Sequence, residues 1–126
     1  MNRHQKTILI VDDEEFVVKA LAKKIKDAGY EVLVQRNGEE GLHEAFEKHP
    51  DLILLDIIMP KMDGMTFLDK LREDEWGKSA RVIILTNLDS GEEAQKSREK
   101  GVTDYLVKTN WSLKDVLSKV EKMLEE

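Results

Sequence analysis

The sequence predicts an α/β fold: a doubly wound, five-stranded parallel sheet with helices on both faces. Five short apolar runs alternate along the chain with amphipathic stretches, which is typical of parallel strands joined by helices. Residues 52–55 and 82–85 are all aliphatic, as expected for strands that are buried on both faces. In such folds the functional site lies beyond the carboxyl ends of the central strands.

The expected elements follow from the hydrophobic pattern in chain order. Strands are expected at TILIV (7–11), EVLV (31–34), DLILLD (51–56), RVIILT (81–86) and DYLVK (104–108). Helices are expected at about 14–28, 38–48, 64–74, 90–100 and 113–125. The first of these helices has an apolar stripe at Val17, Leu21 and Ile25, and the last has one at Leu113, Val116, Val120 and Leu124.

Several helix ends carry local signals. Gly29 and Gly101 each follow a lysine-containing helix end, where a capping residue in the left-handed conformation is favoured. Ser112 and Asp115 form a capping-box pattern, and Trp111 precedes them at the hydrophobic-staple position, so the start of the last helix is well marked.

The fourth helix differs from the others. Residues 90–101, SGEEAQKSREKG, offer only Ala94 as a clearly apolar side chain. A helix without an apolar stripe gains little from packing, so it opens or shifts at little cost. Composition alone leaves two interpretations open, a solvated surface helix and a segment that moves in a switch.

Size and composition restrict the class of protein. With 126 residues we expect a single domain over 1–126. The net charge of −6 disfavours nonspecific binding to nucleic acid or to an anionic membrane. The chain has no cysteine, which excludes thiolate metal sites and cysteine nucleophiles. The apolar run near the start is too short for a signal peptide or a membrane span, so a cytoplasmic location is expected.

Chemically active side chains follow the strand ends. Asp12 and Asp13 follow the first strand, Asp56 ends the third, Thr86 the fourth and Lys108 the fifth. Each has an ordinary explanation alone, as a helix cap, a strand end or a surface lysine. Because parallel strands end at one edge of a sheet, the five should converge, and this conjunction favours a site.

The charges on this edge imply a ligand. Two carboxylates about 5 Å apart repel by about 3 kcal/mol at an effective dielectric of about 20. One lysine cannot neutralise three carboxylates, so either a proton is retained or a cation binds. Oxygen-only ligands favour Mg²⁺ or Mn²⁺. A cation with a lysine and a hydroxyl suits phosphoryl transfer, in which Asp56 could act as the nucleophile and form an aspartyl phosphate.

Four sequence runs of the chain resemble the motifs of a known family. The runs ILIVDDEE, LILLDIIMPKMDG, VIILT and DYLVK, in this order and spacing, resemble the receiver domain of bacterial two-component response regulators over essentially the whole chain. The resemblance implies the flavodoxin-like strand order 2-1-3-4-5. It also implies that Asp56 is the phosphoacceptor, and that Asp12, Asp13, Asp56 and the main-chain carbonyl of Ile58 hold the metal.

The same resemblance implies the switch and the partners. Thr86 and Lys108 contact the phosphoryl oxygens, and Tyr105 matches the aromatic residue that changes rotamer as Thr86 moves. The face formed by helix 4, strand 5 and helix 5 reports phosphorylation. The phosphodonor is expected to be a histidine kinase or a histidine phosphotransfer protein, and the output a downstream effector.

Three departures from the family pattern bear on these expectations. Thr109 stands where proline usually follows the lysine, with one apparent extra residue before the last helix. A cis peptide costs about 2.5–4 kcal/mol without proline, so a trans Lys108–Thr109 peptide is expected, with Lys108 still reaching the acidic edge. Asn87 is bulkier than the usual residue and is expected to restrict phosphodonors. Ile58 and Leu88 are aliphatic, so a long-lived phosphoryl group is expected.

Two other functions compete with the phosphoacceptor switch. A Mg²⁺-dependent phosphohydrolase would use the same chemistry on external substrates, but no second aspartate lies two residues past Asp56 and the chain is too short to cover a substrate. A binding module that works without phosphorylation would tend to lose part of the acidic, threonine and lysine set. Catalysis beyond self-phosphorylation and self-dephosphorylation is not expected. No effector domain follows the fifth helix, so direct nucleic-acid binding is not expected either.

Overall fold

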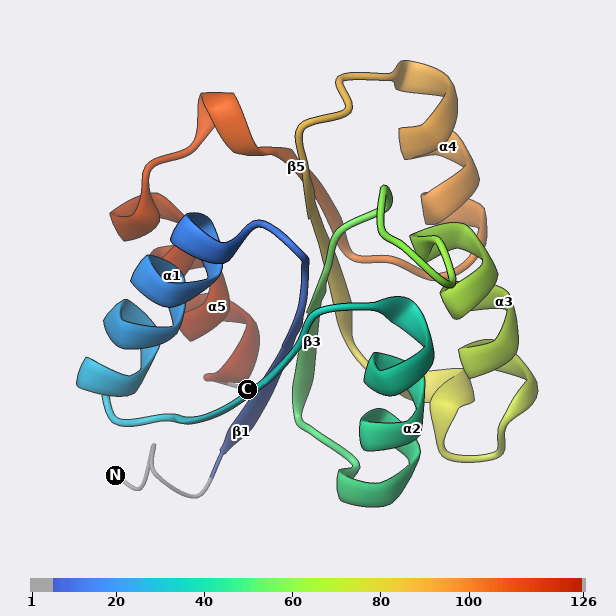
Figure 1. The fold of residues 1–126 in the computed structure, drawn as a ribbon, viewed down its shortest axis with the longest axis horizontal. Coiled ribbons are helices and arrows are strands. Elements are labelled where there is room, and N and C mark those ends of the chain that lie inside the picture. Colours follow the sequence, from blue (N-terminus) through green and yellow to red (C-terminus); the bar gives the residue numbers. More distant parts are fainter. Residues whose placement is uncertain (1–5, 126) are drawn as a thin grey trace.

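The computed structural model describes residues 6–125, in which five strands and five helices alternate along the chain (Figure 1). The strands are β1 (Thr7–Val11), β2 (Glu31–Gln35), β3 (Leu52–Leu55), β4 (Val82–Thr86) and β5 (Asp104–Val107). The helices are α1 (Glu15–Asp27), α2 (Gly38–Lys48), α3 (Gly64–Glu73), α4 (Gly91–Glu99) and α5 (Leu113–Leu124). Two short 3₁₀ turns, η2 (Gly77–Ser79) and η3 (Lys108–Asn110), complete the connections.

The sheet has the predicted topology. Its order is β2-β1-β3-β4-β5, and every adjacent pair is parallel. Val11, at the end of β1, lies in register with Gln35 and Leu55, at the ends of β2 and β3. The carboxyl ends of these strands therefore meet at one edge, as the sequence predicts.

Helices cover both faces of the sheet. In Figure 1, α1 and α5 lie on one side of the strands, and α2, α3 and α4 lie on the other. Alternate strand residues feed two cores: Ile8 and Ile10 pack in the cluster with α1 and α5, whereas Leu9 and Val11 pack in the cluster with α2 and α3. This is the doubly wound arrangement, and it fixes the β1 and β3 backbones between two buried layers.

The helix ends follow the predicted local signals. Gly29 and Gly101 have φ angles of 104° and 84°, the left-handed conformation that glycine adopts without steric cost. Ser112 accepts a hydrogen bond from the amide of Asp115 at 3.1 Å, and Trp111 packs against the core on the α5 side. The start of α5 is therefore held as expected.

Helix α4 is lightly packed. Its only buried residue is Ser97, whose hydroxyl donates to the carbonyl of Ala94. No residue of α4 contributes to either apolar cluster. The helix therefore lacks the apolar stripe that would hold it to the sheet.

No helix within residues 6–125 combines the length and the apolar character that crossing a membrane requires.

Candidate functional site at the strand ends

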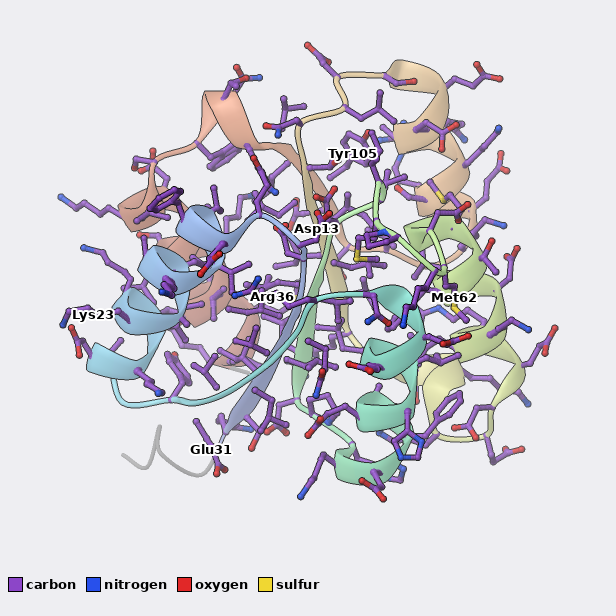
Figure 2. All side chains as sticks on the ribbon, viewed as in Figure 1. Asp13, Lys23, Glu31, Arg36, Met62 and Tyr105 are labelled. Atoms are coloured by element: carbon purple, nitrogen blue, oxygen red, sulfur yellow. The ribbon has the colours of Figure 1, made fainter. Side chains whose placement is uncertain are left out.

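Three carboxylates meet where β1 and β3 end. Asp12, Asp13 and Asp56 each place an oxygen within 4.8 Å of the others. Asp12 and Asp56 are 3% and 5% exposed, whereas Asp13 is open to solvent. Figure 2 shows Asp13 beyond the carboxyl end of the strands, with Glu31, at the start of β2, at the opposite end.

The main chain orients the carboxylate of Asp56. Its Oδ1 atom accepts hydrogen bonds from the amides of Ile57, at 2.7 Å, and Ile58, at 3.4 Å. Gly64 lies against this segment, because a Cβ atom there would approach the carbonyl oxygen of Asp56 to 2.6 Å. The Gly64 amide also donates to the carbonyl of Ile57 at 2.7 Å. The MDG sequence thereby packs the start of α3 against the segment that carries Asp56.

Lys108 enters the same site from the end of β5. Its Nζ lies 2.7 Å from Asp12 Oδ2 and 3.2 Å from Asp56 Oδ2, and it also donates to Glu14 Oε1. The described residues contain no cis peptide, so the Lys108–Thr109 peptide is trans as expected. The 3₁₀ turn η3 begins at Lys108, and this turn directs the chain toward α5 without the proline bend.

The electrostatics of this cluster are dominated by burial and by Lys108. Burial lowers the pKa of Lys108, but hydrogen bonds to Asp12 and Glu14 and the charges of Asp12 and Asp56 outweigh it, so the pKa is raised. Burial raises the pKa of Asp12, although Lys108 opposes the shift. The hydrogen bond from Lys108 lowers the pKa of Glu14. The lysine is therefore a fixed positive charge.

The two expected switch residues are connected through the backbone of one residue, Leu88. Thr86 is fully buried at the end of β4, and its Oγ1 accepts a hydrogen bond from the amide of Leu88 at 3.3 Å. Tyr105 donates from its hydroxyl to the carbonyl of Leu88. Burial and the negative charges of Glu93, Asp89 and Asp56 raise the pKa of Tyr105. The segment between β4 and α4 is thus held from both sides.

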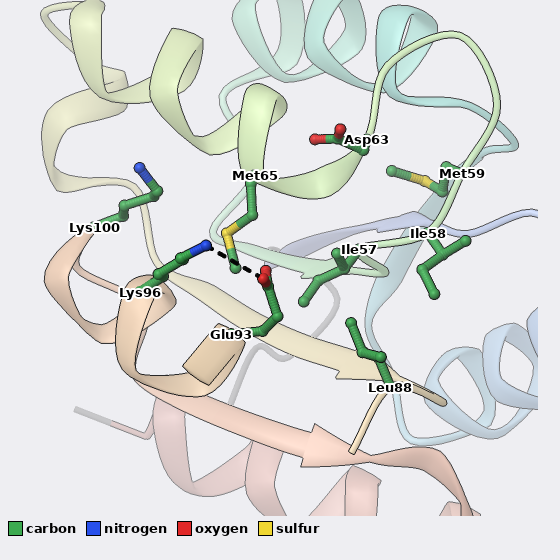
Figure 3. A pocket seen from close by; sticks show the side chains of 9 residues that line it. All are labelled: Ile57, Ile58, Met59, Asp63, Met65, Leu88, Glu93, Lys96 and Lys100. Atoms are coloured by element: carbon green, nitrogen blue, oxygen red, sulfur yellow. Dashed lines mark ion pairs between the residues drawn. The ribbon is translucent and has the colours of Figure 1, made fainter. Parts of the chain in front are cut away.

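Two cavities adjoin at this edge. One of about 230 Å³ is lined by Asp13, Glu14, Asp56, Ile58, Thr86 and Asn87. The other, of about 650 Å³, lies between the β3–α3 segment and α4, with Ile57, Met59, Met65 and Leu88 in its wall and the Glu93–Lys96 ion pair beside it (Figure 3). Ile58 lines both cavities, whereas Leu88 lines only the second. Access to Asp56 is therefore bordered by Ile58 and Asn87.

One contributor to the site, Glu14, was not assigned from the sequence. Glu14 binds Lys108 and also accepts from the Asn87 side chain at 3.3 Å. The available signal was the acidic run DDEE, in which Glu14 directly follows the aspartate pair. The expected metal ligation by the Ile58 carbonyl stays a prediction.

The family model for the response regulator receiver domain matches residues 8–121.

The chain belongs to this family.

Receiver domains are phosphoacceptor switches rather than enzymes that act on external substrates, and the acidic pocket with Lys108 agrees with that class.

Two curated relatives illustrate the sequence similarity. The alkaline phosphatase synthesis transcriptional regulatory protein PhoP of Bacillus subtilis is 35% identical over 119 residues, which are 94% of this chain and 48% of that protein. The response regulator PleD of Caulobacter vibrioides is 39% identical over 101 residues, or 80% of this chain and 22% of that protein. The receiver therefore spans about half of PhoP and a smaller part of PleD.

Solved structures show the same fold at higher coverage. Chemotaxis response regulator CheY4 of Vibrio cholerae has a TM-score of 0.86 and 30% identity, covering 94% of this chain and 98% of that one. The CheX–CheY–BeF₃–Mg²⁺ complex of Borrelia burgdorferi has a TM-score of 0.86 and 31% identity, covering 96% of this chain and 90% of that one.

The donor set fits a hard divalent cation. Asp12, Asp13 and Asp56 supply only oxygen atoms, which is the ligand chemistry that Mg²⁺ and Mn²⁺ prefer. Lys108 and these three carboxylates together leave a net negative charge, even with the lysine fully protonated. A cation would offset that charge, so the residues of this pocket are consistent with a Mg²⁺ site.

Proposed function

We propose that this receiver takes a phosphoryl group on Asp56 from a histidine kinase or a histidine phosphotransfer protein. The observation that carries the proposal is the Asp56 carboxylate itself. It is buried at the end of β3, oriented by two main-chain amides and contacted by Lys108, and it lies close to Asp12 and Asp13. Rigid placement of a nucleophile beside fixed charges is what phosphoryl transfer requires.

The transfer step can be written from these residues. An oxygen of Asp56 attacks the phosphorus of a phosphohistidine, and an O–P bond forms as the P–N bond breaks. The electron pair of the P–N bond goes to the ring nitrogen, which is protonated from water. The product is an aspartyl phosphate. Lys108 and, after it moves, the Thr86 hydroxyl would contact the transferred oxygens.

The proposed cofactor is Mg²⁺, with Mn²⁺ as an alternative. Asp12, Asp13, Asp56 and the main-chain carbonyl of Ile58 would hold it. When bound, the cation supplies positive charge to the phosphoryl oxygens during transfer. Residues of the chain itself position the reacting groups. The main-chain amides of Ile57 and Ile58 orient the Asp56 carboxylate, and Lys108 supplies a fixed positive charge.

Output is proposed through the face formed by α4, β5 and α5. Thr86 moves toward the phosphoryl group, and Tyr105 changes its contact with Leu88 as the β4–α4 segment shifts. Helix α4 has few buried contacts to oppose the shift. A downstream effector reads the new surface. This proposal favours the switch interpretation of α4 over the solvated surface helix.

We also propose that residues 1–126 act as one receiver unit in the cytoplasm, without direct contact to nucleic acid or to a membrane.

The test is labelling by acetyl phosphate with Mg²⁺, followed by intact mass. We expect the parent chain to gain one phosphoryl group and Asp56→Asn to gain none. Asp27→Asn is the matched control, because Asp27 is exposed on α1 and pairs with Lys23. Label retained by Asp56→Asn would contradict the assignment. A parent chain that takes no label would favour a binding module that works without phosphorylation.

A further inference from the structure

The Lys108 ammonium group has three carboxylate partners. An ammonium group offers three donors, and Lys108 contacts carboxylate oxygens of Asp12, Glu14 and Asp56. Any new contact from Lys108 to a phosphoryl oxygen on Asp56 therefore requires one of these contacts to weaken or break.

The three carboxylates differ in what release would cost. The side chains of Asp12 and Asp56 are 4% and 6% exposed, whereas that of Glu14 is 43% exposed. A buried carboxylate that loses its cation is left uncompensated, which is strongly destabilising. An exposed carboxylate regains water, so its ion pair contributes little. Glu14 is therefore the partner that Lys108 can release most easily.

Glu14 has a second contact that reaches another part of the site. The Asn87 side chain donates from Nδ2 to Glu14 Oε1 at 3.3 Å. Glu14 lies directly before α1, and Asn87 directly follows Thr86 at the end of β4. Both residues line the cavity over Asp56. One carboxylate thus links the β1–α1 segment, the lysine and the start of the β4–α4 segment across the mouth of the site.

We propose that Glu14 is a positioning residue that latches the unphosphorylated receiver. It holds Lys108 and Asn87 together, and it is released when Lys108 contacts a phosphoryl group on Asp56. Its release frees Asn87 and with it the segment that leads into α4. This inference rests on the proposed function, because it needs a phosphoryl group at Asp56. It follows that the latch opposes phosphorylation, and that weakening Glu14 shifts the receiver toward its phosphorylated form.

Beryllofluoride with Mg²⁺, a phosphoryl analogue, tests the latch by NMR titration. Glu14→Ala removes both contacts, and we expect it to bind beryllofluoride about twofold to fivefold more tightly than the parent, the size of one exposed ion pair. Glu14→Gln keeps an oxygen acceptor but loses the charge, so an intermediate affinity is expected. Glu15→Gln is the matched control. It removes the same charge one residue away, where Glu15 pairs with Lys19 and Arg36 on the surface of α1.

The side-chain amide signal of Asn87 separates a latch from a simple charge effect. In the parent, we expect this signal to move on beryllofluoride binding toward the position that it has in ligand-free Glu14→Ala. In Glu14→Ala itself, beryllofluoride should move it much less. If Glu14 acted only by repelling the anion, the variant would change the affinity for beryllofluoride. The Asn87 signal of the parent would then not move toward its position in ligand-free Glu14→Ala.

The outcomes distinguish failure of the latch from failure of the proposed phosphoacceptor function. If the parent binds no beryllofluoride, the proposed function fails, and the latch with it. If the parent binds but Glu14→Ala binds no more tightly than Glu15→Gln, the latch is wrong and the phosphoacceptor function stands. An Asn87 signal that does not respond in the parent likewise overturns the latch. Should Glu14→Ala fold poorly, the comparison of Glu14→Gln with Glu15→Gln decides by the same criteria.

Discussion

Ile58 lies two residues beyond Asp56 and lines the cavity over that carboxylate, and the residue is 60% exposed. An aliphatic side chain cannot orient a water molecule by hydrogen bonding. The Ile58 side chain would therefore not orient a water molecule for attack on an aspartyl phosphate at Asp56. It would also occupy part of the path along which that water approaches. The phosphoryl group should therefore be long-lived.

Ile58→Asn should shorten that lifetime. The new amide can hydrogen-bond an attacking water, and one net hydrogen bond in the transition state corresponds to about a fivefold to tenfold faster loss of the phosphoryl group. The measurement is the decay of phosphorylated protein by intact mass after removal of the donor. Met59→Gln is the control, because Met59 lines only the neighbouring cavity. An unchanged or slower decay in Ile58→Asn would refute this account.

At the scale of elements, α4 is held at one end. The Arg72 guanidinium, on α3, donates to the carbonyls of Lys100 and Gly101 just beyond α4, at 2.7 and 3.1 Å. Lys100 in turn pairs with Asp69 of α3 at 2.6 Å. The other end of α4 has the Ser90 cap, but no buried apolar side chain follows it. The helix is thus anchored at its C-terminal end and lightly held where it meets the switch segment.

Arg72→Lys should loosen this anchor. Arg72 also donates to the carbonyls of Gly77 and Ala80 at 2.8 Å each, and a lysine cannot reproduce the planar fork that spans these groups. Losing hydrogen bonds from a charged donor should lower the free energy of unfolding by about 1.5–3 kcal/mol. Urea unfolding measures the change, with the exposed Arg98→Lys in α4 as control. Equal stability of Arg72→Lys and the parent would show that the anchor is dispensable.

For the whole molecule, the strand-end site is where function opposes stability. The chain carries a net charge of −6, and three of its carboxylates lie within 4.8 Å of one another. Lys108 offsets only part of this repulsion. A bound cation would stabilise the folded state by mass action, by about 2.7 kcal/mol at a hundred times its dissociation constant.

Asp13→Ala should therefore have opposite effects with and without metal. Without metal, removing a like charge should raise the melting temperature, because about 1 kcal/mol of repulsion is relieved and shifts the midpoint by about 2–8 °C in a domain of this size. With Mg²⁺, the stabilisation seen in the parent should largely vanish. Thermal unfolding with and without Mg²⁺ measures both effects. A variant that gains as much from Mg²⁺ as the parent would show that Asp13 is only part of a helix start.

Much of this molecule could be predicted because its signals are local. The alternation of apolar runs sets the strands, and their buried character sets a parallel sheet with helices on both faces. A glycine after a helix or a serine before one marks an end through its own backbone chemistry. The shortage of apolar residues in α4 likewise predicts its light packing, since burial depends on composition. The convergence of Asp12, Asp13 and Asp56 follows from topology, because parallel strands end together.

The contacts that tune the site were decided by the tertiary structure. Lys108 and Glu14 are 94 residues apart in sequence, and their contact depends on the 3₁₀ turn at Lys108 and on the rotamers of two long side chains. The reach of Asn87 to Glu14 and the fork of Arg72 depend on loop paths in the same way. Periodicity reports which face of an element is buried, but it carries no information on where a flexible polar side chain finds its partner. The sheet and the acidic edge therefore follow from local sequence patterns, whereas the partners of Lys108 depend on how the loops fold.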